Sequence, residues 1–456
     1  MGMSIFRMYD IRGKVGKELT PEMFVEFGLA IGTFLKGTGL VAVGMDSRTS
    51  GDIFAKSIVA GLMSTGCNVL SLGIVSTPII YYVTAHFPDV TAGVMITASH
   101  NPAQYNGLKI CLKRDQHFIK MVEPEKIKTL FEKKTYTRAD FRTFGKEKQT
   151  DAIKEYAKYL KTHFSFNRPL NVVVDVGNGA CGFAIDVLKS FNHNVIALNQ
   201  EPNGLFPNHE PNPILEENLI DLANQVKQQQ ADIGIAFDGD GDRAGFVDNT
   251  GKIISTAETT MLFAESVLEK EKGAQIAVDV TASRAIEDYV KKIGGKMKIV
   301  RVGYPFVQEE IRKGGVPFAA EYSGHYYFTK NSGYDDGLYA ALIMLSIIDA
   351  SNQPISKLVE KLPKYVSSPE KRYECSDATK FEAIEQIKKI FKEKRYHIND
   401  IDGARVEFEH GWMLIRASNT EPAVALRFEA DSEENLQKIK DKLLPDVDQV
   451  MQKAIT

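Results

Sequence analysis

The sequence predicts an α/β protein of four domains, in which three similar mixed α/β/α sandwich domains precede a small α+β C-terminal domain. Strand and helix patterns alternate up to about residue 368, which is typical of mostly parallel sheets covered on both faces. Three apolar strands end in aspartate, at Asp46, Asp175 and Asp279, and a polar loop and a helix follow each. These units form a faint repeat at the spacing of a domain.

Composition excludes several classes of protein. The chain has 456 residues, 43% of them hydrophobic and 25% charged, which suits several domains with real cores. A net charge of −3 favours neither nucleic acid nor an anionic membrane as a partner. The four cysteines are far apart, as in proteins of a reducing compartment. No leader pattern precedes Asp10 and no apolar run approaches the ~18 residues of a membrane span, so we expect a cytoplasmic protein.

The first domain is expected over residues 1–150. Its first strand ends in a turn with Tyr9, Asp10 and Arg12, groups that can bind an anion. Thr20 is the expected N-cap of the following helix. The expected elements are a strand over 4–13, a helix over 20–34, a strand over 40–44, a helix over 52–63 and a strand over 68–72. The charged, weakly patterned segment 123–145 precedes the boundary.

The remaining domains are expected over 151–255, 256–368 and 369–456. Expected elements are a helix over 151–162, strands over 171–175 and 276–279, a helix over 378–392 and strands over 412–417 and 423–430. A final helix begins after Asp431, the expected N-cap, with Glu434 completing a capping box.

Ser99 lies in the segment Thr97-Ala98-Ser99-His100-Asn101-Pro102, directly after an apolar run that predicts a buried strand. Loops at the carboxyl ends of such strands are the usual place for reacting groups in α/β sheets. The Gly-x-Ser-x-Gly elbow of hydrolases is absent, and the adjacent His100 is expected to point away from Ser99. The segment alone is also compatible with an ordinary loop.

Three carboxylates follow a second apolar strand, at Asp238, Asp240 and Asp242. Because their mutual repulsion would be relieved by a cation, and because all-oxygen ligands suit Mg²⁺, we expect a magnesium site. An EF-hand does not fit, since Arg243 stands at its glycine position and Asn249 at its glutamate position. A solvated acidic turn is the alternative. A phosphate oxygen on Ser99 is the natural further ligand.

Two more segments carry groups suited to a phosphosugar. Arg416-Ala417-Ser418-Asn419-Thr420 combines a guanidinium with hydroxyls and an amide, as an anion site does, although a polar hairpin would look similar. Glu321-Tyr322-Ser323-Gly324-His325 places a carboxylate and a hydroxyl where they could bind adjacent sugar hydroxyls, although an ordinary strand-end turn would also fit.

These four segments, in this order, resemble the signature loops of the α-D-phosphohexomutase superfamily, and Tyr9-Asp10-Ile11-Arg12-Gly13 matches as well. The resemblance covers the whole chain, and within the superfamily it is strongest to the phosphomannomutase/phosphoglucomutase branch. It implies reversible phosphoryl transfer between hexose 1-phosphate and hexose 6-phosphate, with mannose or glucose as the sugar. A phosphoserine enzyme, Mg²⁺ and a glucose or mannose 1,6-bisphosphate intermediate are implied with it.

The resemblance also implies a role for each site residue. Ser99 would be the phosphoserine and, with Asp238, Asp240 and Asp242, would hold the metal. Three further catalytic residues, which stabilise charge and move the hydroxyl proton, would be Arg12, His100 and Lys109. The implied substrate-binding residues are Tyr9, Arg243, Gly303, Tyr304, Glu321, Ser323, Gly324, His325, Arg416, Ser418, Asn419 and Thr420. Among them Glu321 and Ser323 would read the sugar's 3- and 4-hydroxyls, and the last four would clamp the phosphate that does not react.

Two positions depart from the family pattern. The third-domain Val/Thr-Gly-His loop is Val302-Gly303-Tyr304 here, so a phenol replaces an imidazole. Where some members have a lysine, this chain has Thr281, and nearby Arg284 is a candidate substitute.

Three alternatives remain open at this point, as does the oligomeric state. A phosphoglucosamine mutase is disfavoured by Gly241, because those members tend to have alanine there. A Mg²⁺ phosphatase would use an aspartate of the Asp238 cluster as nucleophile. A non-catalytic sugar-phosphate binding protein would carry no phosphate on Ser99.

Overall fold

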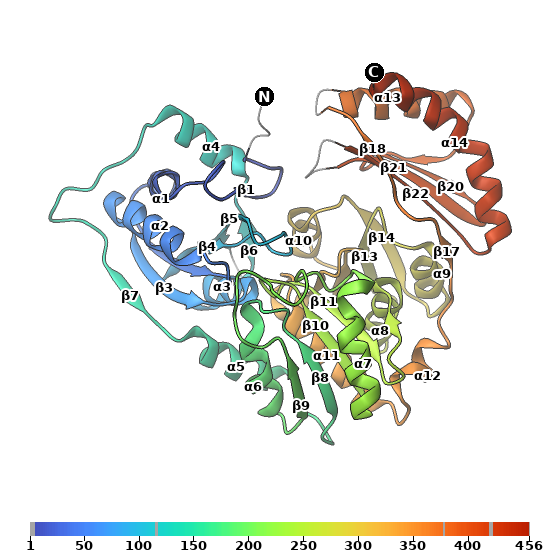
Figure 1. The fold of residues 1–456 in the computed structure, drawn as a ribbon, viewed down its shortest axis with the longest axis horizontal. Coiled ribbons are helices and arrows are strands. Elements are labelled where there is room, and N and C mark those ends of the chain that lie inside the picture. Colours follow the sequence, from blue (N-terminus) through green and yellow to red (C-terminus); the bar gives the residue numbers. More distant parts are fainter. Residues whose placement is uncertain (1–4, 115–116, 377–378, 419–422, 456) are drawn as a thin grey trace.

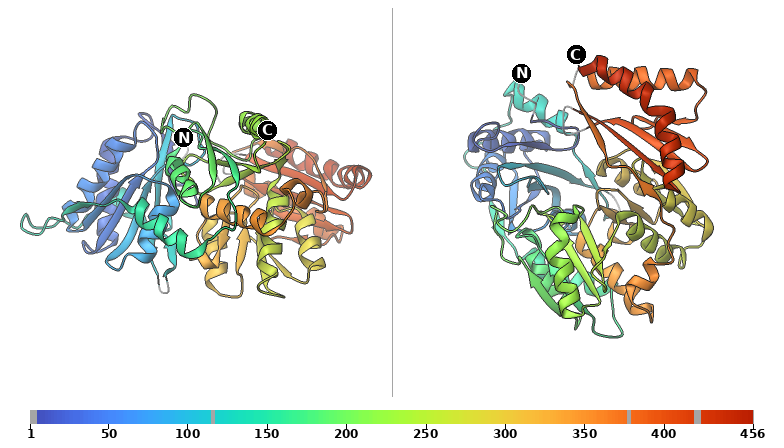
Figure 2. Two further views of the ribbon diagram at one scale, coloured as in Figure 1. Left: turned by 90° about the horizontal axis from the view of Figure 1, so that it is seen from below. Right: turned by 45° about the vertical axis from the view of Figure 1, so that its right-hand side comes forward.

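The computed structural model describes residues 5–114, 117–376, 379–418 and 423–455, and it confirms the α/β class with four domains. Each domain has its own sheet, and we number domains I to IV in chain order. Domains I (blue) and IV (red) lie on opposite sides of the molecule in Figure 1, with domains II (green) and III (yellow to orange) between them, as Figure 2 also shows. Among the described residues, no helix combines the length and apolar character needed to cross a membrane.

Domain I has the strand order β1-β5-β4-β2-β3-β7, with β6 beside β5. Its strands are β1 (Ile11–Lys14), β2 (Leu40–Met45), β3 (Asn68–Ile74), β4 (Val90–Ile96), β5 (Tyr105–Lys113), β6 (Ile119–Met121) and β7 (Glu147–Gln149). Its helices are α1 (Pro21–Phe34), α2 (Gly51–Thr65), α3 (Thr77–His86) and α4 (Pro124–Lys133). The antiparallel pairing of β4 with β5 places Lys109 opposite Met95, near the end of β4 that leads to Ser99.

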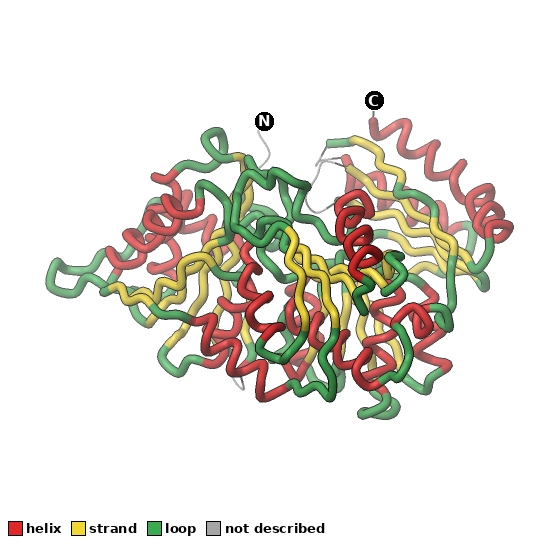
Figure 3. The backbone as a smooth tube through the Cα atoms, turned by 60° about the horizontal axis from the view of Figure 1, so that its bottom comes forward, coloured by secondary structure: helices red, strands yellow, loops and turns green. Residues whose placement is uncertain are grey.

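Domains II and III repeat this plan on a smaller scale, with helices outside the sheets (Figure 3). Domain II, ordered β12-β11-β10-β8-β9, has β8 (Asn171–Asp175), β9 (Asn194–Leu198), β10 (Ile233–Phe237), β11 (Ala244–Asp248), β12 (Ile253–Ile254), α5 (Ala152–His163), α6 (Ala184–Lys189) and α7 (Ile220–Gln229). Domain III, ordered β14-β13-β15-β16, has β13 (Gln275–Asp279), β14 (Lys296–Val300), β15 (Phe318–Ala320), β16 (Tyr326–Phe328), α8 (Thr256–Leu268), α9 (Arg284–Lys292), α10 (Tyr304–Arg312), α11 (Gly337–Ala350) and α12 (Ile355–Val359).

Domain IV is an antiparallel sheet covered by two helices. Its order is β17-β22-β21-β20-β19, with β18 also beside β22. The elements are β17 (Val366–Ser367), β18 (Lys371–Glu374), α13 (Thr379–Glu393), β19 (Ile398–Asn399), β20 (Ala404–Phe408), β21 (Gly411–Ala417), β22 (Ala423–Ala430) and α14 (Glu433–Ile455). Its apolar core is separate, whereas one continuous buried cluster runs through domains I, II and III.

The three strand-ending aspartates make the same local structure. In each case the buried carboxylate accepts a hydrogen bond from the main-chain N–H two residues further on: Arg48 at 3.0 Å, Gly177 at 2.9 Å and Thr281 at 2.6 Å. This is an Asx turn, which ends a strand and directs the chain into the next loop. The repeat seen in the sequence therefore corresponds to a repeated turn at the same place in each domain.

Three details differ from expectation. The first strand is β1 and not a strand over 4–13, so Tyr9 and Asp10 lie before it and Arg12 lies within it. The charged segment 123–145 contains α4 and is followed by β7, neither of which its weak apolar pattern indicated. Helix α14 is capped by Ser432, whose Oγ accepts from Asn435 N at 3.3 Å, and not by Asp431. The Asp431 carboxylate is instead occupied by the side chains of Asn435, at 2.8 Å, and His410, at 2.9 Å.

Candidate active site

Ser99 is held in a backbone conformation that non-glycine residues rarely adopt. Its φ is 51°, in the left-handed region, and the residue is 1% exposed. Its N–H donates to Thr97 Oγ1 at 2.8 Å, and Thr97 Oγ1 donates to Asp46 Oδ2 at 2.7 Å. The Asx turn of Asp46 thus reaches directly into the loop that carries the serine.

Arg48 fixes the same loop through hydrogen bonds to its main chain, a role that the sequence did not indicate. Its buried guanidinium donates to Asp46 and to four main-chain carbonyls. Two of these belong to Ser99, at 2.9 Å, and Asn101, at 2.5 Å. The only signal in the sequence was its place two residues after a strand-ending aspartate, which does not reveal where a long side chain points.

The aspartate loop of domain II meets the serine loop of domain I. Ser99 Oγ donates to Asp238 Oδ2 at 2.8 Å. This approach requires glycine at 239, since a Cβ there would lie 2.6 Å from Ser99 O. Two loops that are distant in sequence therefore share one site.

The donor set of the aspartate loop fits a divalent cation. Asp238, Asp240 and Asp242 each place a carboxylate oxygen within 4.8 Å of the others, and all three are buried. Burial, Asp242 and Asp240 together hold the pKa of Asp238 well above its usual range. Asp240 Oδ1 is buried without a hydrogen-bond partner among the described residues. A cation at this point would relieve the repulsion and satisfy the orphaned oxygen.

Lys109 supplies a positive charge beside these carboxylates. Its Nζ donates to Asp240 Oδ2 at 2.8 Å and also to Asp242. Burial disfavours its charged form, but Asp240 and Asp242 outweigh burial and keep the pKa of Lys109 well above its usual range. The ammonium is therefore charged at neutral pH.

His100 faces Ser99, and the expectation that it points away is wrong. Its Nδ1 lies 3.3 Å from Ser99 Oγ. The left-handed turn at Ser99 rotates the two adjacent side chains to one side, which the sequence could not show. Burial, Arg243 and Arg12 hold the pKa of His100 well below its usual range, so the imidazole is neutral.

In domain III, the segment 321–325 forms a hydrogen-bonded unit around His325. Its two ring nitrogens lie 3.2 Å from Asp242 Oδ1 and 3.2 Å from Glu321 Oε2. Burial and Arg243 lower the pKa of His325, but Asp242 and Glu321 outweigh them and raise it to about 10. Ser323 Oγ is 3.0 Å from the same ring, and Gly324 has a positive φ of 86°.

Asp335 is a second residue that the sequence did not single out. It is fully buried, both of its oxygens lack a hydrogen-bond partner among the described residues, and Oδ2 is 3.8 Å from His325 Nε2. Burial and Asp242 raise the pKa of Asp335 to about 7. Since it precedes Asp336, the N-cap of α11, the sequence is typical of a helix start and hides this position.

A cavity of about 260 Å³ joins these groups. Residues of all four domains line it. The three aspartates that could hold a metal do not line it; they lie behind Ser99 and Lys109, to which they are hydrogen-bonded. The sequence-predicted residues that line it are Tyr9, Arg12, Ser99, His100, Lys109, Arg243, Gly303, Tyr304, Glu321, Ser323, His325, Arg416 and Ser418. Glu370 and Arg372 of domain IV also line it and were not predicted.

The domain IV side of the cavity carries Arg416. Its guanidinium is 3.6 Å from Asp402, and its Nε is buried without a hydrogen-bond partner among the described residues. Lys380 donates to Ser418 O at 2.8 Å, which ties this loop to α13. Asn419 and Thr420 lie outside the described residues.

The two departures from the family pattern lie in different places. Thr281 lines a small adjoining cavity with Ser323 and Arg416, next to the main one. Arg284 does not substitute for a lysine there, because its guanidinium donates to Phe408 O and its N–H to Glu429 at 2.8 Å. It joins domain III to domain IV.

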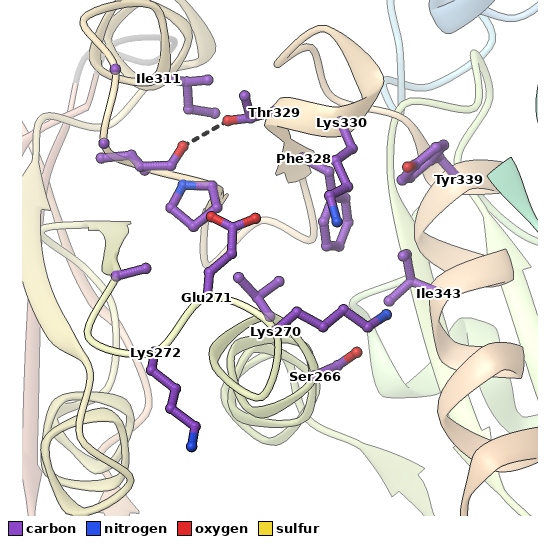
Figure 4. A pocket seen from close by; sticks show the side chains of 16 residues that line it. Ser266, Lys270, Glu271, Lys272, Ile311, Phe328, Thr329, Lys330, Tyr339 and Ile343 are labelled. Atoms are coloured by element: carbon purple, nitrogen blue, oxygen red, sulfur yellow. Dashed lines mark hydrogen bonds between the residues drawn. The ribbon is translucent and has the colours of Figure 1, made fainter.

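A larger cavity, of about 450 Å³, lies in domain III between α8, α10 and α11 (Figure 4). Apolar side chains such as Val267, Ile311 and Phe328 line it together with charged ones such as Lys270 and Lys330. None of the sequence-predicted site residues lines it. We therefore take the smaller cavity as the candidate active site.

Fold and site together define the class: a multidomain α/β protein whose central cavity sets a buried serine against a carboxylate triplet able to hold a metal. Four family descriptions match in order: Phosphoglucomutase/phosphomannomutase alpha/beta/alpha domains I (residues 3–138), II (153–251) and III (256–365) and the C-terminal domain (370–445). The chain belongs to the phosphoglucomutase/phosphomannomutase family.

Individual relatives agree along nearly the full length. A phosphomannomutase/phosphoglucomutase of Pseudomonas aeruginosa is 39% identical over 442 residues, which cover 96% of this chain and 94% of the relative. A phosphoglucomutase of Neisseria gonorrhoeae is 38% identical over 444 residues, 96% of this chain and 95% of the relative. A solved phosphoglucomutase/phosphomannomutase family protein of Burkholderia thailandensis is 33% identical, with a TM-score of 0.90 and coverage of 100% and 99%.

Proposed function

We propose that this protein reversibly transfers a phosphoryl group between positions 1 and 6 of a hexose, mannose or glucose, through phospho-Ser99 and a bound 1,6-bisphosphate. The observation that carries the proposal is the 2.8 Å hydrogen bond from Ser99 Oγ to Asp238 Oδ2, beside a cavity lined from all four domains. Membership of the family and the names of its relatives support the same reaction.

In the first half-reaction the bond from phosphorus to Ser99 Oγ breaks as a bond to the free sugar hydroxyl forms. The hydroxyl proton passes to the neutral imidazole of His100, whose Nδ1 faces Oγ, and from the imidazole to the departing Ser99 oxygen; the same route runs in reverse in the second half-reaction. Lys109 and Arg12 stabilise the negative charge of the transferring group. The bisphosphate then turns end for end, its other phosphate returns to Ser99, and the proton returns to the sugar oxygen.

Asp238, Asp240 and Asp242, with a phosphate oxygen on Ser99, would hold Mg²⁺. When bound, the cation would withdraw charge from the phosphoryl oxygens as a Lewis acid.

The remaining residues would bind the sugar and its second phosphate. Glu321 and Ser323 would bind the 3- and 4-hydroxyls of the ring, and Arg243, Gly303, Gly324 and His325 would surround them. Arg416, whose Nε has no hydrogen-bond partner among the described residues, would clamp the distal phosphate with Ser418, Asn419 and Thr420. Because these contacts are to the ring and to phosphate, either end of the intermediate could face Ser99.

The test is turnover by Ser99→Ala, with Ser346→Ala in α11 as the matched control. We expect Ser99→Ala to retain its fold and lose isomerisation, since no other buried hydroxyl faces Asp238 among the described residues. Isomerisation at the wild-type rate by Ser99→Ala, with bisphosphate supplied, would sink the assignment. Inorganic phosphate released without isomer would indicate the phosphatase instead.

Substrate preference is measured by comparing mannose 1-phosphate, glucose 1-phosphate and glucosamine 6-phosphate. We expect the first two to be turned over best, and preference for the third would favour a phosphoglucosamine mutase. We place the reaction in the cytoplasm, because Cys67, Cys111 and Cys181 are buried thiols that form no disulfide among the described residues.

A further inference from the structure

Two tyrosines exchange hydrogen bonds across the joint between domains I and III. Tyr9 precedes β1, and Tyr304 is the first residue of α10, which packs beside β6 of domain I (Figure 1). Tyr9 Oη donates to Val302 O at 2.7 Å, and Tyr304 Oη donates to Tyr9 O at 2.7 Å. Each phenol therefore reaches into the other domain and satisfies a main-chain carbonyl there.

The contact is built into both loops. The two rings meet edge to face with centroids 5.9 Å apart, and Phe306 packs against Tyr9 in the same way at 5.8 Å. Gly303 has a φ of 123°, and a Cβ there would lie 2.5 Å from the Tyr9 ring. Only glycine at 303 admits the Tyr9 ring so closely.

The pair connects the serine loop to the loop of Glu321. On one side Asp10, next to Tyr9, accepts from Arg12 at 2.5 Å, and Arg12 donates to Asn101 of the serine loop at 2.8 Å. On the other side Gly303, next to Tyr304, donates its N–H to Glu321 Oε1 at 2.7 Å. A continuous series of bonds thus runs from Asn101 to Glu321 through the two tyrosines.

We propose that Tyr304 and Tyr9 are positioning residues that set the distance between the phosphorylated serine and the sugar-recognition loop, and that Tyr304 acts through Tyr9 without binding substrate phosphate. This inference rests on the proposed function. Burial raises the pKa of both phenols above the usual value, so both remain hydrogen-bond donors at neutral pH.

The variants are Tyr304→Phe, Tyr9→Phe and the double variant, assayed as full chains for hexose 1-phosphate isomerisation. Each single change removes one partly buried hydrogen bond but keeps the ring, so we expect kcat to fall roughly tenfold while KM changes less than about twofold. Because both hydroxyls stabilise the same contact between domains I and III, the fold-decrease of kcat in the double variant should be much smaller than the product of the two single fold-decreases. Tyr82→Phe is the control: its hydroxyl donates to Glu155 O at 3.3 Å, also across a domain joint, but away from the cavity.

Thermal unfolding verifies that each variant folds, and Tyr304→His gives a second variant with a donor too short to reach Tyr9 O. We expect it to lose as much kcat as Tyr304→Phe. Any of three results would overturn the positioning role of the two tyrosines. These are a rise in KM with unchanged kcat, losses of kcat that multiply in the double variant, and a wild-type kcat in Tyr304→His. An inactive wild-type protein would instead overturn the proposed function.

Discussion

At the scale of single residues, the position of Ser99 depends on a strained backbone held by buried bonds. A non-glycine residue in the left-handed region costs about 1–3 kcal/mol and persists only where the surrounding structure over-determines its conformation. Arg48 supplies that constraint through five side-chain donations. The strain is tolerated because losing the guanidinium would leave several buried carbonyls without partners.

Arg48→Lys tests this constraint. A lysine has three donors, so at least two of the acceptors lose their partner, and we expect the free energy of unfolding to fall by about 2–4 kcal/mol and kcat to fall at least roughly tenfold. Urea unfolding and steady-state kinetics measure the two effects. Arg142→Lys, at a side chain that is 75% exposed, is the matched control. Unchanged stability and turnover in Arg48→Lys would show that the serine loop keeps its conformation without the guanidinium of Arg48.

The residues that the sequence singled out are those whose neighbours in the chain reveal their chemistry. The carboxylate triplet and Ser99 stand in short, distinctive segments, and the structure brings them within hydrogen-bond distance. Arg48 was missed because most of its partners are distant in the chain, and Asp335 because its place before an N-cap looks like an ordinary helix start. The direction of His100 was predicted wrongly, because it depends on the backbone angle of its neighbour.

At the scale of helices and strands, apolar periodicity and capping residues predicted most of domains I to IV. Helix α1 begins after Thr20, which accepts from Met23 N as expected. Helix α5 (Ala152–His163) agrees with the helix expected over 151–162, and Asp151 is its N-cap, accepting from Lys154 N. Helix α4 was missed, since only two of its residues, Pro124 and Ile127, are buried and its surface is charged. An element that contributes little to the core leaves a weak pattern in the sequence.

Helix α3 ends in a cluster of aromatic side chains that makes a pH dependence predictable. His86 stacks on His117 with centroids 4.7 Å apart and lies 4.9 Å from the Tyr159 ring of α5. Burial, together with His117 and His163, lowers the pKa of His86 to about 4. In the unfolded chain His86 has the usual histidine pKa near 6.5, so below that pH the unfolded state binds a proton that the folded state does not bind. The contribution of neutral His86 to the free energy of unfolding is therefore complete above pH ~6.5 and is lost as pH falls towards ~4.

Urea unfolding at pH 7 and pH 5 measures this loss in the wild type and in His86→Gln. We expect the variant to lose less stability between the two pH values, because it no longer contains the group that titrates differently on unfolding. His397→Gln, at an exposed histidine outside the cluster, is the matched control. An identical loss in wild type and His86→Gln would exclude His86 as the cause.

At the scale of the whole molecule, the cavity exists only because four domains meet. One buried cluster runs through domains I to III, whereas domain IV has a core of its own. Domain IV is joined to domain III by Trp412 and Leu414, which pack with Val280, and by buried polar contacts. Arg405, for example, donates to Val280 O at 2.7 Å and Ala282 O at 2.9 Å. A separately packed last domain suits an intermediate that must turn over without leaving, since domain IV could move as a unit. The sequence predicted the four domains but not which side chains join them, because such contacts leave no periodic pattern.

The central claim is that the reacting phosphate is carried on Ser99, opposite the aspartate triplet. Intact mass measurement of the purified protein, followed by localisation of the modified peptide, tests this claim most directly. We predict one phosphate group on Ser99 that is present before and after turnover and that becomes labelled when hexose 1-phosphate with an isotope-labelled phosphate is added. A fully active protein that carries no phosphate on Ser99 at any point of turnover would contradict the account.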